Sequence, residues 1–378
     1  MKISSNHLCY CFNVLDENDS NPISPHFIKL ISKIRNKINF PENEEFAVGL
    51  WINAEKIKQF SDMHKINLLR KTLDENNLYV TTINAFPYAA FHNKSIKENV
   101  YIPDWRSDER LQYTIKVAEL LSEILPSGIT GSISTVPGGY QKFIKNDDLA
   151  EISKKLTAMN RHLNNILQRK KKKIILAVEF EPDCIWEKAQ QFIDFKNHYL
   201  KNQNDFIGVC YDCAHAEVLK TNPIKDLNTL EEFNIPIGKI QLSAALKAKI
   251  PEAKQELAKF ADNVYLHQTF IYDKNHLILR EEDLPHIIDK IDKDKIRGEL
   301  LSHYHLPIFF ESNKTKSIRA AKNTLIKLTD LPALKKITNT TFEIETYTYS
   351  VLPQNLKFQT VEDMISEEYK YAIGIIKK

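Results

Sequence analysis

Strand-like apolar runs alternate with amphipathic helical stretches along the whole of this 378-residue chain. Strands are predicted at residues 7–14, 45–52, 78–86, 131–136, 173–181, 205–212, 239–244 and 341–348. Helices are predicted at residues 25–38, 54–76, 108–125, 147–169, 185–200, 250–261 and 316–328. This alternation is typical of βαβ units and a parallel sheet, and eight main strands favour a closed (β/α)₈ barrel over an open sheet. Because such barrels often exceed the usual domain size, we expect residues 1–378 to form a single domain.

One connection breaks the regular alternation. Residues 246–339 separate the seventh strand from the eighth, which is far more chain than one crossover needs. Two further strand-like runs, 263–272 and 298–310, lie inside this segment. Long insertions on a barrel often carry function. We therefore expect residues 246–339 to cover the C-terminal mouth of the barrel.

Composition limits the classes of function. The formal net charge of +3 does not indicate the strongly basic surface that is typical of nucleic-acid-binding proteins. No apolar run approaches the roughly 20 residues that a membrane span needs. Five cysteines, with no signal peptide, are typical of a reducing compartment. The phosphate-binding patterns GxGxxG and GxxxxGK[ST] are both absent from the sequence. We expect a soluble, cytoplasmic protein.

Polar groups end the later strands, where barrel enzymes place their chemistry. The fifth strand ends in Glu179 and Glu181, which share one side of the strand. The sixth ends in Asp212, with His215 three residues on, and the seventh carries Gln241. The eighth carries Glu343 and Glu345, again on one face.

Each of these groups also has a structural explanation. A strand-end glutamate is more often solvated or paired with lysine, and Asp212 with His215 could cap a loop. Gln241 could satisfy buried backbone groups. The order Glu, Asp, Gln, Glu at successive strand ends favours a divalent-metal site, with Mg²⁺ or Mn²⁺ suited to oxygen ligands and histidine allowing Zn²⁺.

The long insertion adds three histidines to the candidates. His267 lies in the first inner run, and His303 and His305 share one face of the second. They are either structural histidines, in the core or on the surface, with their hydrogen bonds satisfied, or groups that reach the site and bind the substrate.

The segment from Gly208 to His215 is similar to the GxxxDxxH strand end of the xylose isomerase-like superfamily, and Glu343-Ile344-Glu345-Thr346 is similar to its terminal ligand strand. That superfamily includes sugar-phosphate isomerases and epimerases and the family 2 AP endonucleases. The resemblance implies that Glu179 or Glu181, Asp212, Gln241 and Glu345 occupy its four metal positions. It also implies that the glutamates of the fifth and eighth strands form a proton-transfer pair.

More narrowly, the chain resembles the EboE group, the barrel component of the bacterial ebo gene cluster, described as metabolite traffic proteins. The resemblance rests on four segments, which are residues 132–139, 265–268, 303–309 and 343–348. It implies other ebo-cluster proteins as partners. The chain departs from the group after the first strand, where Asn13-Val14-Leu15-Asp16 stands in place of a His-Pro-Gly-Glu segment.

The leading hypothesis is a metal-dependent isomerase or epimerase that acts on a small sugar-like or cyclitol-like compound. Glu345 and one of Glu179 and Glu181 would transfer the proton, while His215, with His267, His303 or His305, would orient hydroxyls. The alternative is a non-catalytic carrier of such a metabolite. An AP endonuclease is disfavoured because Asn84 and Ser134 stand where those enzymes have metal-binding histidines.

Overall fold

Eight parallel strands form the centre of the molecule in this computed structural model, which describes residues 1–16, 19–89, 97–200, 206–329 and 337–376. In chain order they are β2 (Asn6–Tyr10), β3 (Phe46–Trp51), β4 (Leu78–Asn84), β5 (Gly131–Thr135), β6 (Ile174–Glu179), β7 (Ile207–Asp212), β8 (Ile237–Leu242) and β14 (Thr341–Ile344). Their spatial order is β2-β14-β8-β7-β6-β5-β4-β3, and a parallel bridge between Cys11 and Gly49 joins the two ends. The predicted (β/α)₈ barrel is confirmed. A short strand, β1 (Lys2–Ile3), pairs antiparallel with β2.

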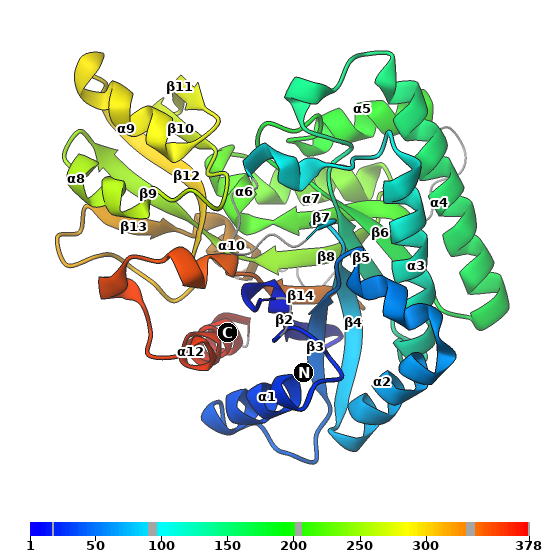
Figure 1. Cartoon of the computed structure of the whole chain (residues 1–378). Coiled ribbons are helices and arrows are strands. Elements are labelled where there is room, and N and C mark those ends of the chain that lie inside the picture. Colours follow the sequence, from blue (N-terminus) through cyan, green and yellow to red (C-terminus); the bar gives the residue numbers. More distant parts are fainter. Residues whose placement is uncertain (17–18, 90–96, 201–205, 330–336, 377–378) are drawn as a thin grey trace.

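Helices surround the barrel (Figure 1). They are α1 (Pro25–Lys37), α2 (Met63–Glu75), α3 (Asp108–Ile124), α4 (Asp148–Lys170), α5 (Ala189–Tyr199), α6 (Cys213–Val218), α7 (Pro223–Glu232), α10 (Asn323–Thr329) and α12 (Val361–Ile376). The starts of several are fixed by side-chain caps, such as Ser24 for α1, Ser107 for α3 and Asn222 for α7. At the C-terminal end of the chain, α12 packs beside α1.

Short 3₁₀ helices connect the strands and helices. These are η1 (Phe12–Val14), η2 (Lys56–Ser61), η3 (Lys97–Tyr101), η4 (Gln141–Phe143), η5 (Ala258–Phe260), η6 (Tyr347–Val351) and η7 (Gln354–Leu356). Three of them carry residues to the open end of the barrel, namely η1 and η6, which closely follow β2 and β14, and η3, in the longer connection after β4. Barrel strands are buried on both faces, which explains why they read as near-continuous apolar runs.

The long insertion contains a second, antiparallel sheet. Its strands are β9 (Ala244–Ile250), β10 (Thr269–Asp273), β11 (His276–Glu281), β12 (Gly298–Leu306) and β13 (Ile318–Ala321), in the spatial order β11-β10-β12-β9-β13. Two helices accompany it, α8 (Lys254–Leu257) and α9 (Leu284–Lys293). Figure 1 shows this sheet to one side of the barrel, at the upper left.

The sequence predicted only two of these five strands. The predicted helix at 250–261 is only α8 and η5, because β9 directly follows β8 after the single residue Ser243. The predicted helix at 316–328 begins late, since residues 318–321 pair with β9 as strand β13. The short strand β13 pairs with a distant partner and carries little local signal. Residues 330–336 of the insertion lie outside the described residues.

Among the described residues, no helix combines the length and apolar character needed to cross a membrane.

Candidate functional site

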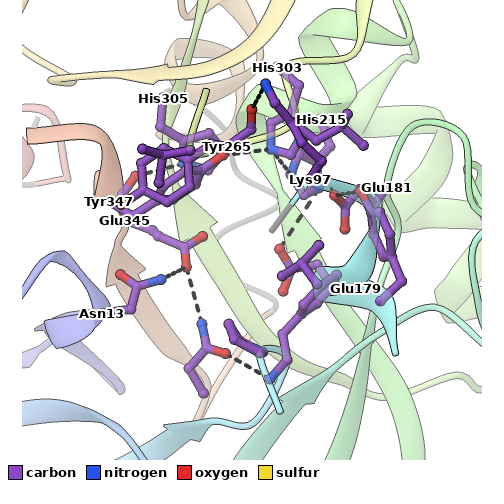
Figure 2. A pocket seen from close by; sticks show the side chains of 17 residues that line it. Asn13, Lys97, Glu179, Glu181, His215, Tyr265, His303, His305, Glu345 and Tyr347 are labelled. Carbon is purple, nitrogen blue, oxygen red and sulfur yellow. Dashed lines mark hydrogen bonds and ion pairs between the residues drawn. The ribbon is translucent and has the colours of Figure 1, made fainter. Parts of the chain in front are cut away.

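A pocket opens at the C-terminal ends of the barrel strands (Figure 2). One part of its wall comes from the barrel, through residues that end or follow strands. The other part comes from the insertion. Its lining residues are Asn13, Asn84, Phe86, Pro87, Lys97, Val100, Tyr101, Glu179, Glu181, His215, Val264, Tyr265, Leu266, His303, His305, Glu345 and Tyr347.

Both glutamates of the fifth barrel strand reach this pocket. Glu179 is the last residue of β6, and Glu181 follows it by two positions, so both side chains leave the same side of the chain. The hydroxyl of Tyr101 donates to Oε1 of Glu181 at 2.6 Å. Oε2 of Glu179 is buried and has no hydrogen-bond partner. The two carboxylates therefore have different surroundings, and that of Glu179 is the one left open.

Asp212 ends β7 and caps the helix that follows. Its Oδ1 accepts hydrogen bonds from the backbone N–H of His215 at 2.8 Å and from Oγ of Ser243 at 2.9 Å. The other oxygen, Oδ2, is buried without a partner. Capping thus accounts for one oxygen of Asp212 and leaves the second available to another group.

Glu345 lies directly after β14, across the pocket from Glu179 (Figure 2). Its Oε1 accepts from Nδ2 of Asn13 at 2.8 Å and from Nδ2 of Asn84 at 3.1 Å. Asn13 lies in η1, just after β2, and Asn84 is the last residue of β4; both amides point a donor at the same oxygen. They fix the orientation of the Glu345 carboxylate.

Gln241 lies one layer deeper than the pocket. Strand register places Gln241 level with Asp212 of β7 on one side and with Glu343 of β14 on the other. Glu343 precedes Glu345 by two residues. Gln241 is fully buried and does not line the pocket, and its Oε1 accepts from Sγ of Cys210 at 3.1 Å. Its Nε2 has no partner. In this orientation the unpartnered group of the amide is a donor, and the amide must rotate by half a turn to offer an oxygen ligand.

Glu343 is level with Gln241, so it lies one layer deeper in the barrel than Glu345. Its carboxylate forms a fully buried ion pair with Lys239, Nζ to Oε2 2.5 Å, inside the barrel. Sequence reasoning gave Lys239 no role, although a lysine in an apolar strand at the same face as Gln241 was a signal. Gly49 makes room for this pair, because a β-carbon there would lie 2.0 Å from Oε1 of Glu343.

Three of the four candidate histidines converge on the pocket. Nε2 of His215 and Nε2 of His303 lie 2.8 Å apart, and the ring of His305 lies beside both, at centroid distances of 5.7 and 5.2 Å. His267 is placed differently. Its Nδ1 contacts the backbone oxygen of His303 at 2.9 Å and its Nε2 contacts Asp262 at 2.6 Å, so both nitrogens are used within the insertion. His267 does not line the pocket.

Burial shifts the titration of the pocket groups. It raises the pKa of Glu181 to about 7 and, together with the charge of Asp212, that of Glu345 to about 8. Burial and the charges of Glu345 and Asp212 also raise the pKa of Glu179 well above its ordinary value. The cause is common to all three: acidic groups crowd into a space that water barely enters. Perturbed carboxylates in a cleft are typical of functional sites.

The donor set suits a divalent cation. One oxygen each of Glu179 and Asp212 and Nε2 of His305 are buried without partners. Ligand atoms of Glu179, Asp212 and His215 lie within 4.8 Å of one another, as do those of Asp212, His305 and Glu345. Unpartnered buried acceptors cost free energy unless a cation or donor satisfies them. These residues fit a bound metal.

Lys97 joins the barrel to the insertion at the rim of the pocket. From η3, its Nζ donates to the backbone oxygens of Asp262 at 2.9 Å and Tyr265 at 2.7 Å, and to Oδ2 of Asp283 at 2.7 Å. This contact pattern places the 262–266 segment of the insertion against the loop that follows β4. Lys97 and Tyr101 were missed in the sequence, because nothing local marks residues whose partners are so distant: 165 positions from Lys97 to Asp262, and 80 and 167 from Tyr101 to Glu181 and Gln268.

No protein-family model and no curated protein sequence matches the chain. Solved structures do. A zinc-bound IOLI protein shares 14% identity at a TM-score of 0.52, over 98% of each chain. A xylose isomerase-like TIM-barrel protein from Mycobacterium smegmatis, in complex with magnesium, shares 10% identity at a TM-score of 0.54, over 99% of this chain and 97% of that one. An L-ribulose 3-epimerase shares 8% identity at 0.54, over 98% and 95%. The fold is that of the xylose isomerase-like TIM barrels.

Proposed function

We propose that the pocket is the active site of a divalent-metal-dependent isomerase or epimerase that acts on a small polyhydroxylated carbonyl compound, sugar-like or cyclitol-like. One observation carries the proposal. Carboxylates from three separate strand ends, Glu179, Asp212 and Glu345, are buried together: Glu179 and Glu345 line the pocket, and Asp212 has a ligand atom within 4.8 Å of ligand atoms of both. One oxygen each of Glu179 and Asp212 has no hydrogen-bond partner. The similar folds include a protein with bound zinc, one with bound magnesium and an epimerase.

Glu179, Asp212 and Glu345 would hold the metal, with Glu181 and Gln241 as further candidates. When bound, a divalent ion polarises substrate oxygens and makes the neighbouring carbon a stronger acid. Burial, and after it the charge of Asp212, raise the pKa of Glu345 in the metal-free chain, and a bound cation would favour its ionised form.

The proton transfer itself is assigned to facing carboxylates. Glu345, held by Asn13 and Asn84, takes the proton from the carbon beside the carbonyl group. Glu179 or Glu181 returns a proton to the opposite face of that carbon or to its neighbour. Figure 2 supports this pairing, since Glu345 and Glu179 project into the pocket from opposite sides.

The remaining lining residues would position the substrate. His215, His303 and His305 form one wall, where they meet substrate hydroxyls directly or through a bound ion. The insertion, residues 246–339, covers the mouth of the barrel in this proposal. Its support is that Val264, Tyr265 and the two strand-β12 histidines line the same pocket as the barrel carboxylates. His267 acts indirectly here, by holding the backbone of His303.

The finer resemblance to the EboE group is part of the same proposal. Its support is local: residues 303–309 and 343–348, which carry two of its four motifs, contribute His303, His305, Glu345 and Tyr347 to the pocket. Partners among ebo-cluster proteins, which would supply or remove the metabolite, follow from this resemblance. The departure after β2 falls at Asn13, which contacts Glu345.

The test is incorporation of solvent deuterium into a panel of ketoses and cyclitols, by Mn²⁺-loaded protein. The wild type should label at least one member, and Glu345→Gln should do so about 10²–10⁴-fold more slowly. Glu367→Gln, a change at an exposed glutamate, should match the wild type. Equal labelling by Glu345→Gln would remove Glu345 from the mechanism. No labelling by the wild type, with calorimetric binding of a panel member, would favour the carrier.

A further inference from the structure

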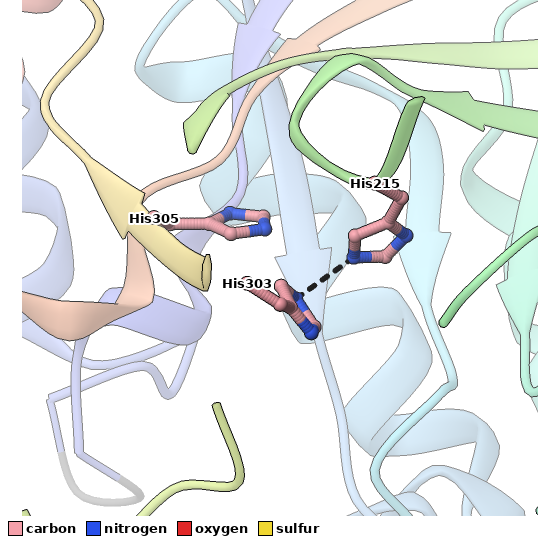
Figure 3. A group of neighbouring side chains, drawn as sticks. All are labelled: His215, His303 and His305. Carbon is pink, nitrogen blue, oxygen red and sulfur yellow. Dashed lines mark hydrogen bonds between the residues drawn. The ribbon is translucent and has the colours of Figure 1, made fainter. Parts of the chain in front are cut away.

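His215, His303 and His305 meet at one point from two different parts of the fold (Figure 3). His215 comes from α6 of the barrel, and the other two come from strand β12 of the insertion. All three are buried, and one ring nitrogen of each lies within 4.8 Å of one ring nitrogen of both others. What such a cluster does depends on which nitrogens carry protons.

The contacts of Nδ1 decide the protonation of two rings directly. Nδ1 of His215 lies 2.7 Å from the backbone oxygen of Phe180, and Nδ1 of His305 lies 3.0 Å from the backbone oxygen of Glu345. A carbonyl oxygen only accepts, so each Nδ1 must carry the hydrogen. In a neutral imidazole the other nitrogen, Nε2, is then a bare lone pair.

His303 is fixed by a chain of contacts through Gln268. Nε2 of Gln268 lies 3.0 Å from the backbone oxygen of Pro182, which only accepts, so the amide nitrogen must face it. Oε1 of Gln268 therefore faces Nδ1 of His303, at 2.7 Å, and Nδ1 must donate. Nε2 of Gln268 also donates to the hydroxyl of Tyr101 at 2.7 Å, and that hydroxyl donates to Glu181. The network is consistent throughout.

Two lone pairs consequently face each other across 2.8 Å, on Nε2 of His215 and Nε2 of His303. The third lone pair, on Nε2 of His305, is buried with no partner. The hydroxyl of Tyr347 lies 3.4 Å from Nε2 of His303, near the outer limit of a hydrogen bond. Facing lone pairs repel unless a cation lies between or beside them.

Carboxylates lie near the cluster but beyond hydrogen-bond distance of its bare Nε2 atoms. Oδ1 of Asp212 lies 3.9 Å from Nε2 of His215, and Oε1 of Glu181 lies 3.7 Å from Nδ1 of His303. These carboxylates are close enough to stabilise a positive charge in the histidine cluster, but they donate no hydrogen bond to the Nε2 lone pairs.

We propose that His215, His303 and His305 bind a transition-metal ion through their three Nε2 atoms, at a site distinct from the carboxylates that take Mg²⁺ or Mn²⁺. Imidazole nitrogens suit Zn²⁺, Co²⁺, Fe²⁺ and their neighbours, whereas carboxylate oxygens suit Mg²⁺ and Mn²⁺. Phe180, Gln268 and the backbone of Glu345 hold the rings in the binding tautomer, as outer partners of metal-bound histidines do.

Three histidine ligands leave a coordination position open to water or substrate oxygen, as in catalytic zinc sites. The inference deepens the proposed function and rests on it for the chemical use of this ion. Metal binding itself can be measured without any substrate, so the two ideas fail separately.

The experiment is a Co²⁺ titration of the full chain after chelator treatment, followed by the visible absorption of the ion. The wild type should bind one Co²⁺ with absorption typical of low coordination, and Zn²⁺ should displace it while Mg²⁺ should not. His303→Ala and His305→Ala should each abolish the signal. His276→Ala, at an exposed histidine of β11, should leave it intact. Gln268→Leu, which removes an outer partner, should weaken Co²⁺ binding about 10–100-fold.

Glu345→Gln separates this site from the carboxylate site. It keeps the backbone oxygen that holds His305, so the Co²⁺ signal should persist while deuterium exchange is lost. Loss of the Co²⁺ signal in Glu345→Gln to the same extent as in His303→Ala would show one shared site and overturn the inference. Persistence of the signal without any exchange by the wild type would instead leave the inference standing and remove the proposed reaction.

X-ray absorption at the zinc edge needs no variant, should the histidine changes prevent folding. The Zn²⁺-loaded wild type should show three imidazole ligands. A shell dominated by carboxylate oxygen, or no zinc bound after reconstitution, would overturn the inference.

Discussion

The ammonium group of Lys239 and the carboxylate of Glu343 form an ion pair that is wholly buried inside the barrel, one layer below the pocket. Lys239 also donates to Oγ of Ser134 at 2.8 Å, so its charge is held by two barrel strands besides its own. This pair separates Glu343 from the pocket and leaves Glu345 as the carboxylate of β14 that reaches it. A positive charge beneath an acidic site also moderates the repulsion among the carboxylates above.

Lys239→Met should destabilise the fold strongly. It leaves the Glu343 carboxylate buried without a counter-charge, which typically costs about 3–5 kcal/mol of unfolding free energy. Urea denaturation measures the change. Adding Glu343→Gln to the same chain should recover part of the loss, because the stranded charge is gone. As a control, Lys247→Met, at a partly exposed pair with Glu299, should cost at most about 1 kcal/mol. Equal losses from Lys239→Met and Lys247→Met would contradict this account.

The two amide donors to Glu345 should matter for turnover more than for folding. Asn13→Ala or Asn84→Ala removes one hydrogen bond to the carboxylate, at 2.8 and 3.1 Å respectively. A hydrogen bond to a charged group contributes about 1.5–3 kcal/mol, so kcat/KM should fall about 10–100-fold in each variant. Asn67→Ala, on the exposed surface of α2, is the matched control. Unchanged kcat/KM in both pocket variants would show that neither amide positions Glu345.

The metal-free chain should lose stability as pH rises. Folding raises the pKa of Glu181 to about 7 and that of Glu345 to about 8, so the folded state binds more protons than the unfolded state between about pH 4.5 and 8. Unfolding free energy therefore falls across that window. Glu345→Gln mimics the protonated acid, so in chelator it should match the wild type at pH 5 and exceed it at pH 8.5. A wild type more stable than Glu345→Gln at pH 8.5 would contradict the sign of this shift.

Lys97→Met should loosen the insertion from the barrel. It removes three hydrogen bonds, to Asp262, Tyr265 and Asp283, which join η3 to the insertion. Hydrogen–deuterium exchange of residues 262–268 should then become faster, while exchange of β6 and β7 stays slow. Lys142→Met, which breaks an exposed pair with Glu282, should leave both regions unchanged. Unaltered exchange at 262–268 in Lys97→Met would mean that the insertion is held by other contacts.

Barrel strands could be predicted from the sequence because each is buried on both faces and reads as a continuous apolar run. The strand-end carboxylates Asp212 and Glu345 were predicted for a related reason: an acid at the end of such a run stands out. The network that orients His303 could not be predicted, because Gln268 and Tyr101 meet only through the fold. Strand β9 was missed because it continues from β8 with no turn sequence between them.

The most direct measurement is a crystal structure of the chain soaked in Mn²⁺ and Zn²⁺, with anomalous maps recorded at both absorption edges. The account predicts a Mn²⁺ peak with carboxylate oxygens of Asp212, Glu345 and one of Glu179 and Glu181 at about 2.0–2.6 Å. It predicts a separate Zn²⁺ peak at Nε2 of His215, His303 and His305. Absence of any metal peak in this pocket, with both ions bound elsewhere or not at all, would contradict the account.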